Sequence, residues 1–165
     1  MTSQIDSPKR FSLVVIHRNG EQRLLDFLDS ANSVIDKDQD EIIVVDNHST
    51  DNSLESAISQ YPSLGIIRNN YNTGYATACN QGIEHSQGQF VLLCNNDILL
   101  PKNVIQQLIS DFAIHPEAGL IGGQLVTPAG HFSRSAGNAT RFWSELGFKS
   151  KRKLIFDRQT PTEVE

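Results

Sequence analysis

Short apolar runs alternate along this chain with segments in which apolar residues recur at helical spacing. The runs lie at residues 11–16, 42–45, 64–67, 90–93 and 120–126. Four of them are rich in β-branched residues and lack polar alternation, which is typical of strands covered on both faces. The pattern therefore predicts strands of a sheet that has helices on both sides.

Four segments between these runs carry an apolar stripe with the period of an α-helix. The stripes are Leu24, Phe27, Leu28, Ala31 and Ile35; Leu54, Ala57, Ile58 and Tyr61; Ala76, Cys79 and Ile83; and Ile105, Leu108, Ile109 and Phe112. Pro101 fits the first turn of the last helix, where its missing N–H is not needed. Strands that alternate with helices imply right-handed crossovers and a mostly parallel sheet, which is an α/β fold.

Polar loops follow four of the apolar runs. They span residues 17–20 (HRNG), 46–51 (DNHSTD), 68–74 (RNNYNTG) and 95–97 (NND). In an open parallel sheet, ligands bind outside the carboxyl ends of the strands. One such loop is ordinary turn chemistry, whereas four of them on one edge of a sheet indicate a polar cleft.

Two aspartates at predicted strand ends are candidates for ligand contact. Asp46 can accept hydrogen bonds from a base or from ribose hydroxyls, although Asp, Asn, Ser and Thr also favour turns and helix N-caps. Asp97 follows an apolar run, so its carboxylate is expected at the edge of the cleft. A hard divalent cation commonly uses one or two carboxylates plus substrate phosphates. A turn before a helix also explains residues 95–97, so both interpretations stay open.

Residues 72–74 precede a run of small residues, which lets a ligand or a strand approach the predicted helix closely. Ala76, Ala78 and Gly82 also fit tight packing of a helix on a sheet, whereas Asn80 has no such explanation. Arg68 is able to balance a phosphate or to stack on a base, although an arginine is more commonly a surface residue.

The charge and composition of the chain restrict the classes of partner and ligand that it is expected to bind. The 165 residues include 19 acidic and 14 basic side chains, and the resulting net charge of -5 argues against a nucleic-acid partner. An anionic ligand then needs local cations, a metal ion or helix N-termini. The five histidines show no metal-ligand spacing and are interpreted as structural or solvated. The sequence contains no GxGxxG fingerprint, P-loop or GxSxG elbow.

The sequence also bears on the cellular compartment. Cys79 and Cys94 form no CxxC motif or disulfide framework, so we expect free thiols in a reducing compartment. The N-terminus has no apolar signal core, and no apolar run approaches the roughly 20 residues of a membrane-spanning helix. We therefore expect a cytoplasmic protein. Residues 148–156 (FKSKRKLIF) mix cations with apolar side chains, which fits either peripheral contact with an anionic membrane or a solvated end.

Four motifs stand in register along the chain: residues 43–51 (IVVDNHSTD), 68–74 (RNNYNTG), 78–82 (ACNQG) and 92–98 (LLCNNDI). Together they resemble the family 2 glycosyltransferases, which have the Rossmann-like GT-A fold. Residues 119–130 (GLIGGQLVTPAG) look like the rhamnosyltransferase-like branch of that family. The likeness runs from Phe11 to Asn138. It implies a mostly parallel sheet flanked by helices, incomplete at the C-terminus.

The resemblance implies a role for each matching position. A nucleotide-sugar donor, such as a UDP- or dTDP-sugar, would contact Asp46 through its nucleoside, with Ser49 and Asp51 shaping that pocket. Its base and diphosphate would be lined by Arg68, Asn72, Gly74, Asn80 and Asn95. Asp97, at the family's DXD position, would coordinate Mg²⁺ or Mn²⁺ that bridges the diphosphate. The implied reaction is inverting transfer of the sugar to a hydroxyl of a saccharide or lipid-linked acceptor, with the metal as Lewis acid.

The sequence departs from the family pattern in three places. Asn95 replaces the first aspartate of DXD, which removes one negative charge. His17 and Arg18 stand where the family usually has a smaller or aromatic pair. No Asp or Glu occupies a context that matches the family's general base, so the catalytic residues stay unassigned. The only late carboxylates are Glu145, Asp157, Glu163 and Glu165.

These observations lead to a domain scheme and two hypotheses. We expect a flexible N-terminus at residues 1–10, a nucleotide-sugar-binding GT-A domain at 11–140 and a basic, apolar tail at 141–165. The first hypothesis is a glycosyltransferase domain, and the alternative is a non-catalytic nucleotide-sugar-binding or interaction module. The exposed core edge of an incomplete domain would also favour a homo-oligomer.

Overall fold

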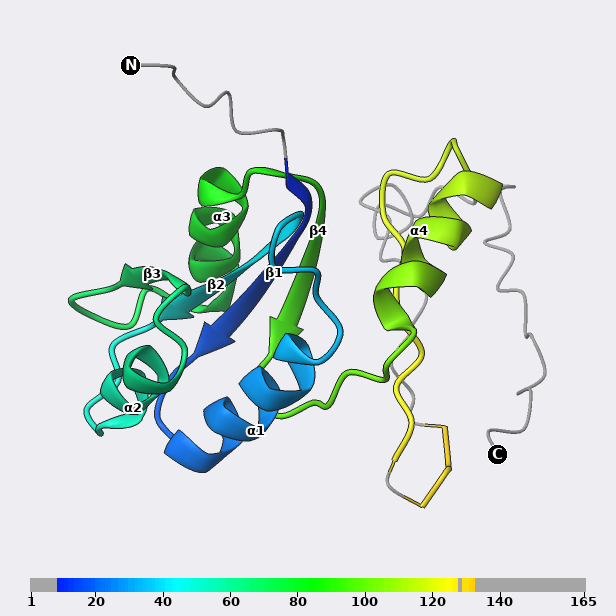
Figure 1. Ribbon diagram of the computed structural model, residues 1–165. Helices are drawn as coiled ribbons and strands as arrows, with labels where there is room; N and C mark the ends of the chain where they lie inside the picture. Colours follow the sequence, from blue (N-terminus) through cyan, green and yellow to red (C-terminus); the bar gives the residue numbers. More distant parts are fainter. Residues whose placement is uncertain (1–8, 128, 133–165) are drawn as a thin grey trace, which may run out of the picture. The chain divides into compact units, whose positions relative to one another are not determined.

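Four parallel strands form one sheet, with helices in the connections between them (Figure 1). The computed structural model describes residues 9–127 and 129–132. Its elements, in chain order, are β1 (Lys9–His17), α1 (Glu21–Asn32), β2 (Asp40–Asp46), α2 (Ser53–Gln60), β3 (Gly65–Arg68), α3 (Tyr75–His85), β4 (Gly88–Asn95) and α4 (Val104–Ile114). The strand order in the sheet is β3-β2-β1-β4. The expectation of an α/β fold is confirmed.

The register brings the carboxyl ends of all four strands to one edge of the sheet. His17 at the end of β1 pairs with Asp46 at the end of β2, and Asp46 pairs with Arg68 at the end of β3. On the other side of β1, Ile16 pairs with Asn95 of β4. Polar loops that are far apart in the sequence therefore lie side by side, as the strand-end pattern predicts.

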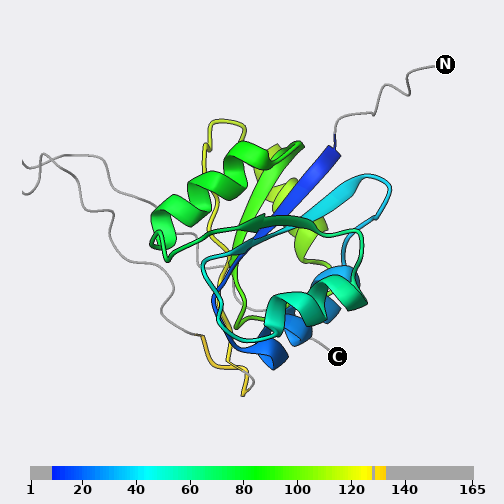
Figure 2. The same cartoon turned by 90° about the vertical axis from the view of Figure 1, so that its left-hand side faces the viewer.

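Helices cover both faces of the sheet (Figures 1 and 2). On one face α3 packs against β1 and β2, where Val14, Ile16, Ile43 and Val45 form a buried cluster with Ala78 and Cys79 of the helix. The opposite face carries α1 and α2, of which Leu24, Phe27, Leu28 and Leu54 are buried. Phe112 of α4 stacks on Phe90 of β4 at 5.0 Å between ring centroids.

The side chains of the two edge strands are less buried than the solid apolar runs predict. Val91 and Leu93 of β4 are 37% and 38% exposed, and β3 is also largely exposed. The physical reason is position, because α3 contacts β1 and β2, which are the two central strands. A solid apolar run therefore marks a strand here without marking burial on both faces.

The predicted strand at residues 120–126 is wrong. In this part of the described chain only Val126 forms a β-bridge, with Phe132, and Leu120 is 88% exposed. Gly122 and Gly123 interrupt the run, and glycine weakens a strand because it adds backbone entropy and no packing side chain. Pro101 likewise lies before α4, which begins at Val104, and not in its first turn.

Contacts divide the chain into two compact units, Met1–His115 and Pro116–Glu165. The strands and helices named above all belong to the first unit. The predicted boundary between residues 140 and 141, the tail at 141–165 and most of the N-terminal segment 1–10 lie outside the described residues. Within the described part of the chain, no helix is long and apolar enough to span a membrane.

Candidate functional site

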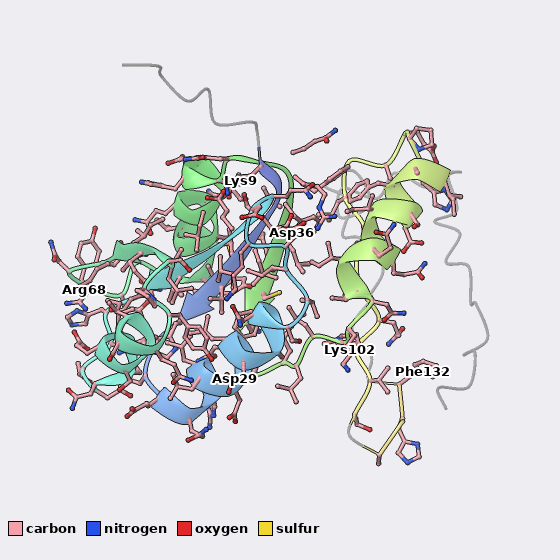
Figure 3. The ribbon with its side chains drawn as sticks, viewed as in Figure 1. Lys9, Asp29, Asp36, Arg68, Lys102 and Phe132 are labelled. Carbon is pink, nitrogen blue, oxygen red and sulfur yellow. The ribbon has the colours of Figure 1, made fainter. Side chains whose placement is uncertain are left out.

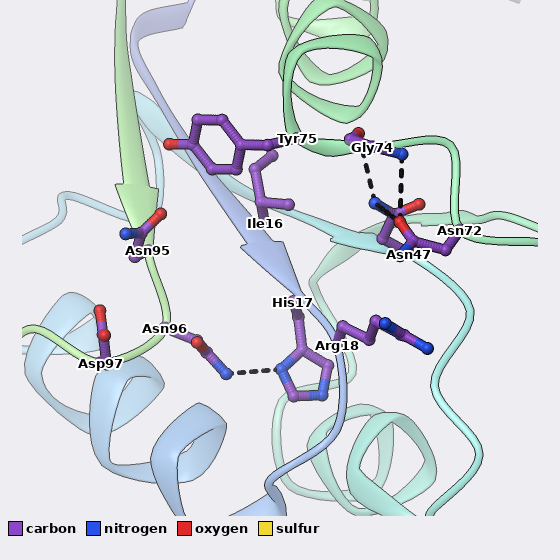
Figure 4. Close-up of a pocket in the computed structure, with 10 residues that line it drawn as sticks. All are labelled: Ile16, His17, Arg18, Asn47, Asn72, Gly74, Tyr75, Asn95, Asn96 and Asp97. Carbon is purple, nitrogen blue, oxygen red and sulfur yellow. Dashed lines mark hydrogen bonds between the residues drawn. The ribbon is translucent and has the colours of Figure 1, made fainter.

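A cavity of about 370 Å³ opens at the carboxyl ends of β1 and β4, beside the N-terminus of α3 (Figure 4). Its walls come from four segments that are widely separated in the sequence. The lining residues are Ile16, His17, Arg18, Asn47, Asn72, Gly74, Tyr75, Asn95, Asn96 and Asp97. Seven of these side chains are polar or charged, not counting Tyr75, so the predicted polar cleft is present.

Asn47 organises one wall of the cavity. Its amide Nδ2 donates to Asn72 Oδ1 (2.9 Å) and to the carbonyl of Gly74 (3.3 Å), while its Oδ1 accepts from the backbone and hydroxyl of Thr73 (2.9 and 3.0 Å). Asn69 Nδ2 also donates to Asn47 Oδ1 at 3.3 Å. Because Asn47 is buried and fully hydrogen-bonded, it holds the loop between β3 and α3 in place, with Gly74 at a φ of 82°.

His17 organises the opposite wall. Its ring is completely buried, with Nε2 at 2.7 Å from Ser53 Oγ and Nδ1 at 2.8 Å from Asn96 Nδ2 (Figure 4). Burial lowers the pKa of His17, although the charges of Asp46 and Asp51 act in the opposite direction. A neutral imidazole therefore connects the end of β1 with the turn that follows β4.

The predicted nucleoside residues Asp46, Ser49 and Asp51 join two loops. Asp46 Oδ1 accepts from the backbone N–H of Ser49 (3.2 Å) and from its hydroxyl, and Ser49 Oγ accepts from the N–H of Asn19 (2.9 Å). Asp51 accepts from the N–H of Gly20 at 2.7 Å and from Ser53. The hydrogen bond from Ser53 is the largest cause of the lowered pKa of Asp51. Turn chemistry thus accounts for these contacts, and none of the three residues lines the cavity.

The other predicted donor-site residues divide into two groups. Asn72, Gly74, Asn95 and Asp97 line the cavity together. Arg68 and Asn80 do not: Arg68 Nη2 lies 2.7 Å from Glu55 Oε1 at the outer edge of the sheet (Figure 3), and Asn80 is exposed on α3. The pKa of Glu55 is lowered first by a hydrogen bond from its own backbone N–H and then by the hydrogen bond with Arg68.

Tyr75, Arg18, Asn96 and Asn47 line the cavity although the sequence assigned none of them a role. The sequence contains a signal for them, because each lies within three residues of a predicted strand end or directly after Gly74. Arg18 is the only lysine or arginine among the ten lining residues. Burial raises the pKa of Tyr75, whose hydroxyl points towards Asn95 in Figure 4. It therefore remains a neutral hydrogen-bonding group.

The residues around Asp97 fit a divalent cation only in part. Among the described residues, no group of three His, Cys, Asp or Glu side chains is placed to hold a metal ion. Asp97 contributes one carboxylate to the cavity wall, and Asn95 and Asn96 contribute amide groups. This oxygen-rich but weakly charged set suits Mg²⁺ or Mn²⁺ when a bound diphosphate supplies the remaining ligands.

Comparisons with known proteins agree with this architecture. The profile described as "Glycosyl transferase family 2" matches residues 12–164, which is most of the chain. The chain belongs to this family. The resemblance seen in the four strand-end motifs is thereby confirmed, and so is the GT-A-like character of the fold.

Among curated relatives, the N-acetylglucosaminyl-diphospho-decaprenol L-rhamnosyltransferase of Mycobacterium tuberculosis is 27% identical over 106 residues. The match covers 58% of this chain and 34% of the relative, so the family 2 chain spans about a third of that protein's length.

Several solved structures are similar as well. S. aureus TarS 1–349 in complex with UDP-GlcNAc is 25% identical with a TM-score of 0.59, over 65% of this chain and 32% of the TarS 1–349 chain. The mannosyltransferase PcManGT of Pyrobaculum calidifontis, in complex with GDP-Man and Mn²⁺, has a TM-score of 0.61 and 21% identity. It matches over 74% of this chain and 39% of PcManGT. At that identity the second likeness supports the fold alone.

Proposed function

We propose that the cavity binds the diphosphate of a nucleotide-sugar donor, together with Mg²⁺ or Mn²⁺ held by Asp97. One observation carries this proposal: Asn95 and Asp97 at the end of β4 face the N-terminus of α3 across the same cavity (Figure 4). A diphosphate that lies between them would meet a carboxylate-bound cation on one side and helix N–H groups on the other. Both partners favour a doubly charged anion.

The N-terminus of α3 is suited to such an anion. Gly74 is its N-cap and makes no side-chain capping hydrogen bond, so the first N–H groups of the helix have no side-chain acceptor. Exposed N–H groups at a helix N-terminus bind phosphate oxygens, and a glycine allows the anion to approach closely. Arg18 adds the one full positive charge on the cavity wall.

The proposed reaction is inverting transfer to an acceptor hydroxyl. The acceptor oxygen forms a bond to the anomeric carbon as the bond to the diphosphate oxygen breaks, and the nucleoside diphosphate leaves with that electron pair. When bound, the cation neutralises charge on the departing diphosphate as a Lewis acid. The residues of this chain hold the donor, with Asp97 at the cation and Asn72 and Gly74 beside the helix N-terminus. The base that takes the acceptor's proton is unassigned.

The donor and acceptor classes are proposed from the relatives. A UDP- or dTDP-sugar is proposed because TarS was solved with UDP-GlcNAc and because the mycobacterial relative is a rhamnosyltransferase. That relative's name also contains a diphospho-decaprenol acceptor, which supports a lipid-linked saccharide as acceptor. The contacts of Asp46, Ser49 and Asp51 with the nucleoside, and of Arg68, Asn80 and Asn95 with the donor, remain part of this proposal.

Calorimetry with UDP, dTDP and UDP-GlcNAc, with and without Mn²⁺, tests the proposal. We expect Mn²⁺ to strengthen nucleotide binding by about tenfold or more, and Asp97→Ala to remove that gain while metal-free binding remains. Asp26→Ala, which removes an exposed aspartate of α1, is the matched control and should leave the gain unchanged. Absence of nucleotide binding under every metal condition would overturn the proposal.

The alternative of a non-catalytic binding module makes a different prediction. Asn95 at the position of an aspartate favours it, because the site has one negative charge fewer for a cation. Such a module would bind the nucleotide without sugar transfer or donor hydrolysis. Turnover of a nucleotide sugar by the purified chain would exclude it.

A further inference from the structure

Four side chains form a continuous series of hydrogen bonds, and two of them, His17 and Asn96, line the cavity. Asp51 in the loop after β2 accepts from the Ser53 hydroxyl, and Ser53 Oγ lies 2.7 Å from His17 Nε2. His17 Nδ1 lies 2.8 Å from Asn96 Nδ2, in the turn after β4. Ser53 and His17 are both completely buried. This series of hydrogen bonds therefore connects two loops through the interior of the protein.

The ionised state of Asp51 determines where the hydrogen lies in each of these hydrogen bonds. An ionised carboxylate only accepts hydrogen bonds, so the Ser53 hydroxyl must direct its hydrogen at Asp51. The lone pairs of Ser53 Oγ then face His17, so Nε2 carries the ring hydrogen. Nδ1 of the neutral ring is left without a hydrogen and must accept, so Asn96 must turn its NH₂ group towards His17.

Two further observations agree with this assignment. The N–H of Gly20 donates to the second oxygen of Asp51 at 2.7 Å, and together with Ser53 this contact lowers the pKa of Asp51, which keeps the carboxylate ionised. His17 is completely buried, and its Nδ1 faces the NH₂ group of Asn96, a donor from which only a ring nitrogen without a hydrogen can accept. Asp51 and His17 thus have the states that the hydrogen-bond directions require.

The consequence for the cavity lies at Asn96. Because its NH₂ group is held by His17, its carbonyl oxygen Oδ1 points away from the ring, as Figure 4 shows. Asn96 lines the cavity directly before Asp97. An amide oxygen is a ligand that Mg²⁺ and Mn²⁺ accept, whereas an NH₂ group turned to the same place would repel a cation.

We propose that Asp51, Ser53 and His17 act as positioning residues that present the Asn96 side-chain oxygen, beside Asp97, to the cation of the donor diphosphate. The inference rests on the proposed function, since it concerns the same cation. It gives Asn96 the role of a neutral second ligand at a site where Asn95 has replaced a carboxylate. A substitution at Asp51 or Ser53 should then alter the orientation of the Asn96 side chain at the opposite wall of the cavity.

Ser53→Ala tests the relay without touching the cavity wall, because Ser53 is not among the lining residues. The matched control is Ser56→Ala, which removes another serine hydroxyl of α2 that donates to a carboxylate, that of Glu21. We expect Ser53→Ala and Asn96→Ala each to lower the Mn²⁺-dependent gain in UDP affinity about tenfold, the size typical for residues that orient metal ligands. Binding of UDP without metal should stay unchanged, as should every value for Ser56→Ala.

A second readout is independent of nucleotide binding. Proton–nitrogen correlation spectra of the full chain should show His17 with a hydrogen on Nε2 and none on Nδ1, and this pattern should persist in Ser56→Ala. A hydrogen on Nδ1, or a doubly protonated ring at neutral pH, would overturn the relay whether or not the chain binds nucleotide.

The two proposals fail in different ways. If the wild-type chain binds no nucleotide, the proposed function fails, and the spectra still decide the hydrogen positions. If wild-type binding depends on Mn²⁺ but both Ser53→Ala and Asn96→Ala keep the full gain while folded by circular dichroism, the role of Asn96 at the cation is wrong and the proposed function stands.

Discussion

At the scale of single residues, Asn47 does more to hold the site in place than its position in a polar loop indicates. Its buried side chain makes five hydrogen bonds to the loop between β3 and α3. Asn47→Ala leaves several of those partners without an acceptor or donor, and each unsatisfied buried group costs about 1–3 kcal/mol. We therefore expect urea denaturation to show a loss of about 2–4 kcal/mol in the free energy of unfolding.

Asn70→Ala is the control for that substitution. Asn70 lies in the same loop and is exposed. Its removal should change the free energy of unfolding by less than about 0.5 kcal/mol, as for most surface substitutions. Equal effects of the two substitutions would show that Asn47 is not the anchor of the loop.

His17 should make stability depend on pH. Its folded-state pKa is lowered below 6.5 by burial, so the unfolded chain binds a proton more readily than the folded one. Its contribution is therefore complete above about pH 6.5 and is lost as the pH falls through the lower folded-state pKa. We expect the free energy of unfolding of the wild type to fall as the pH drops below about 6.5, and this part of the slope to be absent in His17→Phe.

His85→Phe provides the comparison, because His85 is an exposed histidine of α3. Chemical denaturation at a series of pH values should give this variant the slope of the wild type. If His17→Phe also keeps that slope, the buried ring does not titrate differently in the folded and unfolded chain.

At the scale of elements, Gly82 determines how closely α3 approaches the sheet. A Cβ at this position would lie 2.3 Å from Val14 Cγ1 and 3.3 Å from Val45 Cγ2, both in the buried cluster. Overpacking of a core costs about 1–3 kcal/mol, and the better helix propensity of alanine offsets roughly 1 kcal/mol. We expect Gly82→Ala to lower the free energy of unfolding by about 1–2 kcal/mol in urea denaturation.

A double-mutant cycle checks that the steric contact is the cause. Val14→Ala removes the methyl group that Gly82→Ala would meet. The two substitutions together should destabilise the protein by less than the sum of the single effects. Additive effects would mean that α3 does not press on Val14.

The elements also show where pattern reading succeeds. The strands β1, β2, β3 and β4 and the helices between them were predictable, because period-3.6 stripes and solid apolar runs reflect which face of each element is buried. The run at residues 120–126 has the same apolar content but forms no strand, since Gly122 and Gly123 interrupt it. Apolar content alone does not predict a strand, because a strand also needs an adjacent strand with which its backbone forms hydrogen bonds.

At the scale of the whole molecule, every residue that lines the cavity precedes residue 98 and belongs to the unit Met1–His115. A fragment that ends at His115 should therefore bind UDP in the presence of Mn²⁺ with the affinity of the full chain, measured by calorimetry. The reason is that a site built within one compact unit keeps its geometry when the other unit is absent. A folded fragment that has lost binding would show that residues 116–165 contribute to the donor site.

The sequence by itself determined the order of strands and helices and the loops that meet at the carboxyl edge of the sheet. Asn72, Gly74, Asn95 and Asp97, which the strand-end loops and the family resemblance single out, line the cavity, and their role at a donor stays a prediction. These properties depend on burial patterns and on the fixed direction of parallel strands, both of which are local or follow from topology.

Only the tertiary structure decided which polar side chains face the cavity and which join one loop to another. Arg68 turns to Glu55, Asp51 turns to Gly20 and Ser53, and His17 reaches Asn96, 79 positions along the chain. Such pairings depend on side-chain directions and on the register between distant strands, which no local pattern contains. The orientation of the Asn96 amide is the clearest case, because it follows from hydrogen positions passed on from Asp51 through two buried side chains.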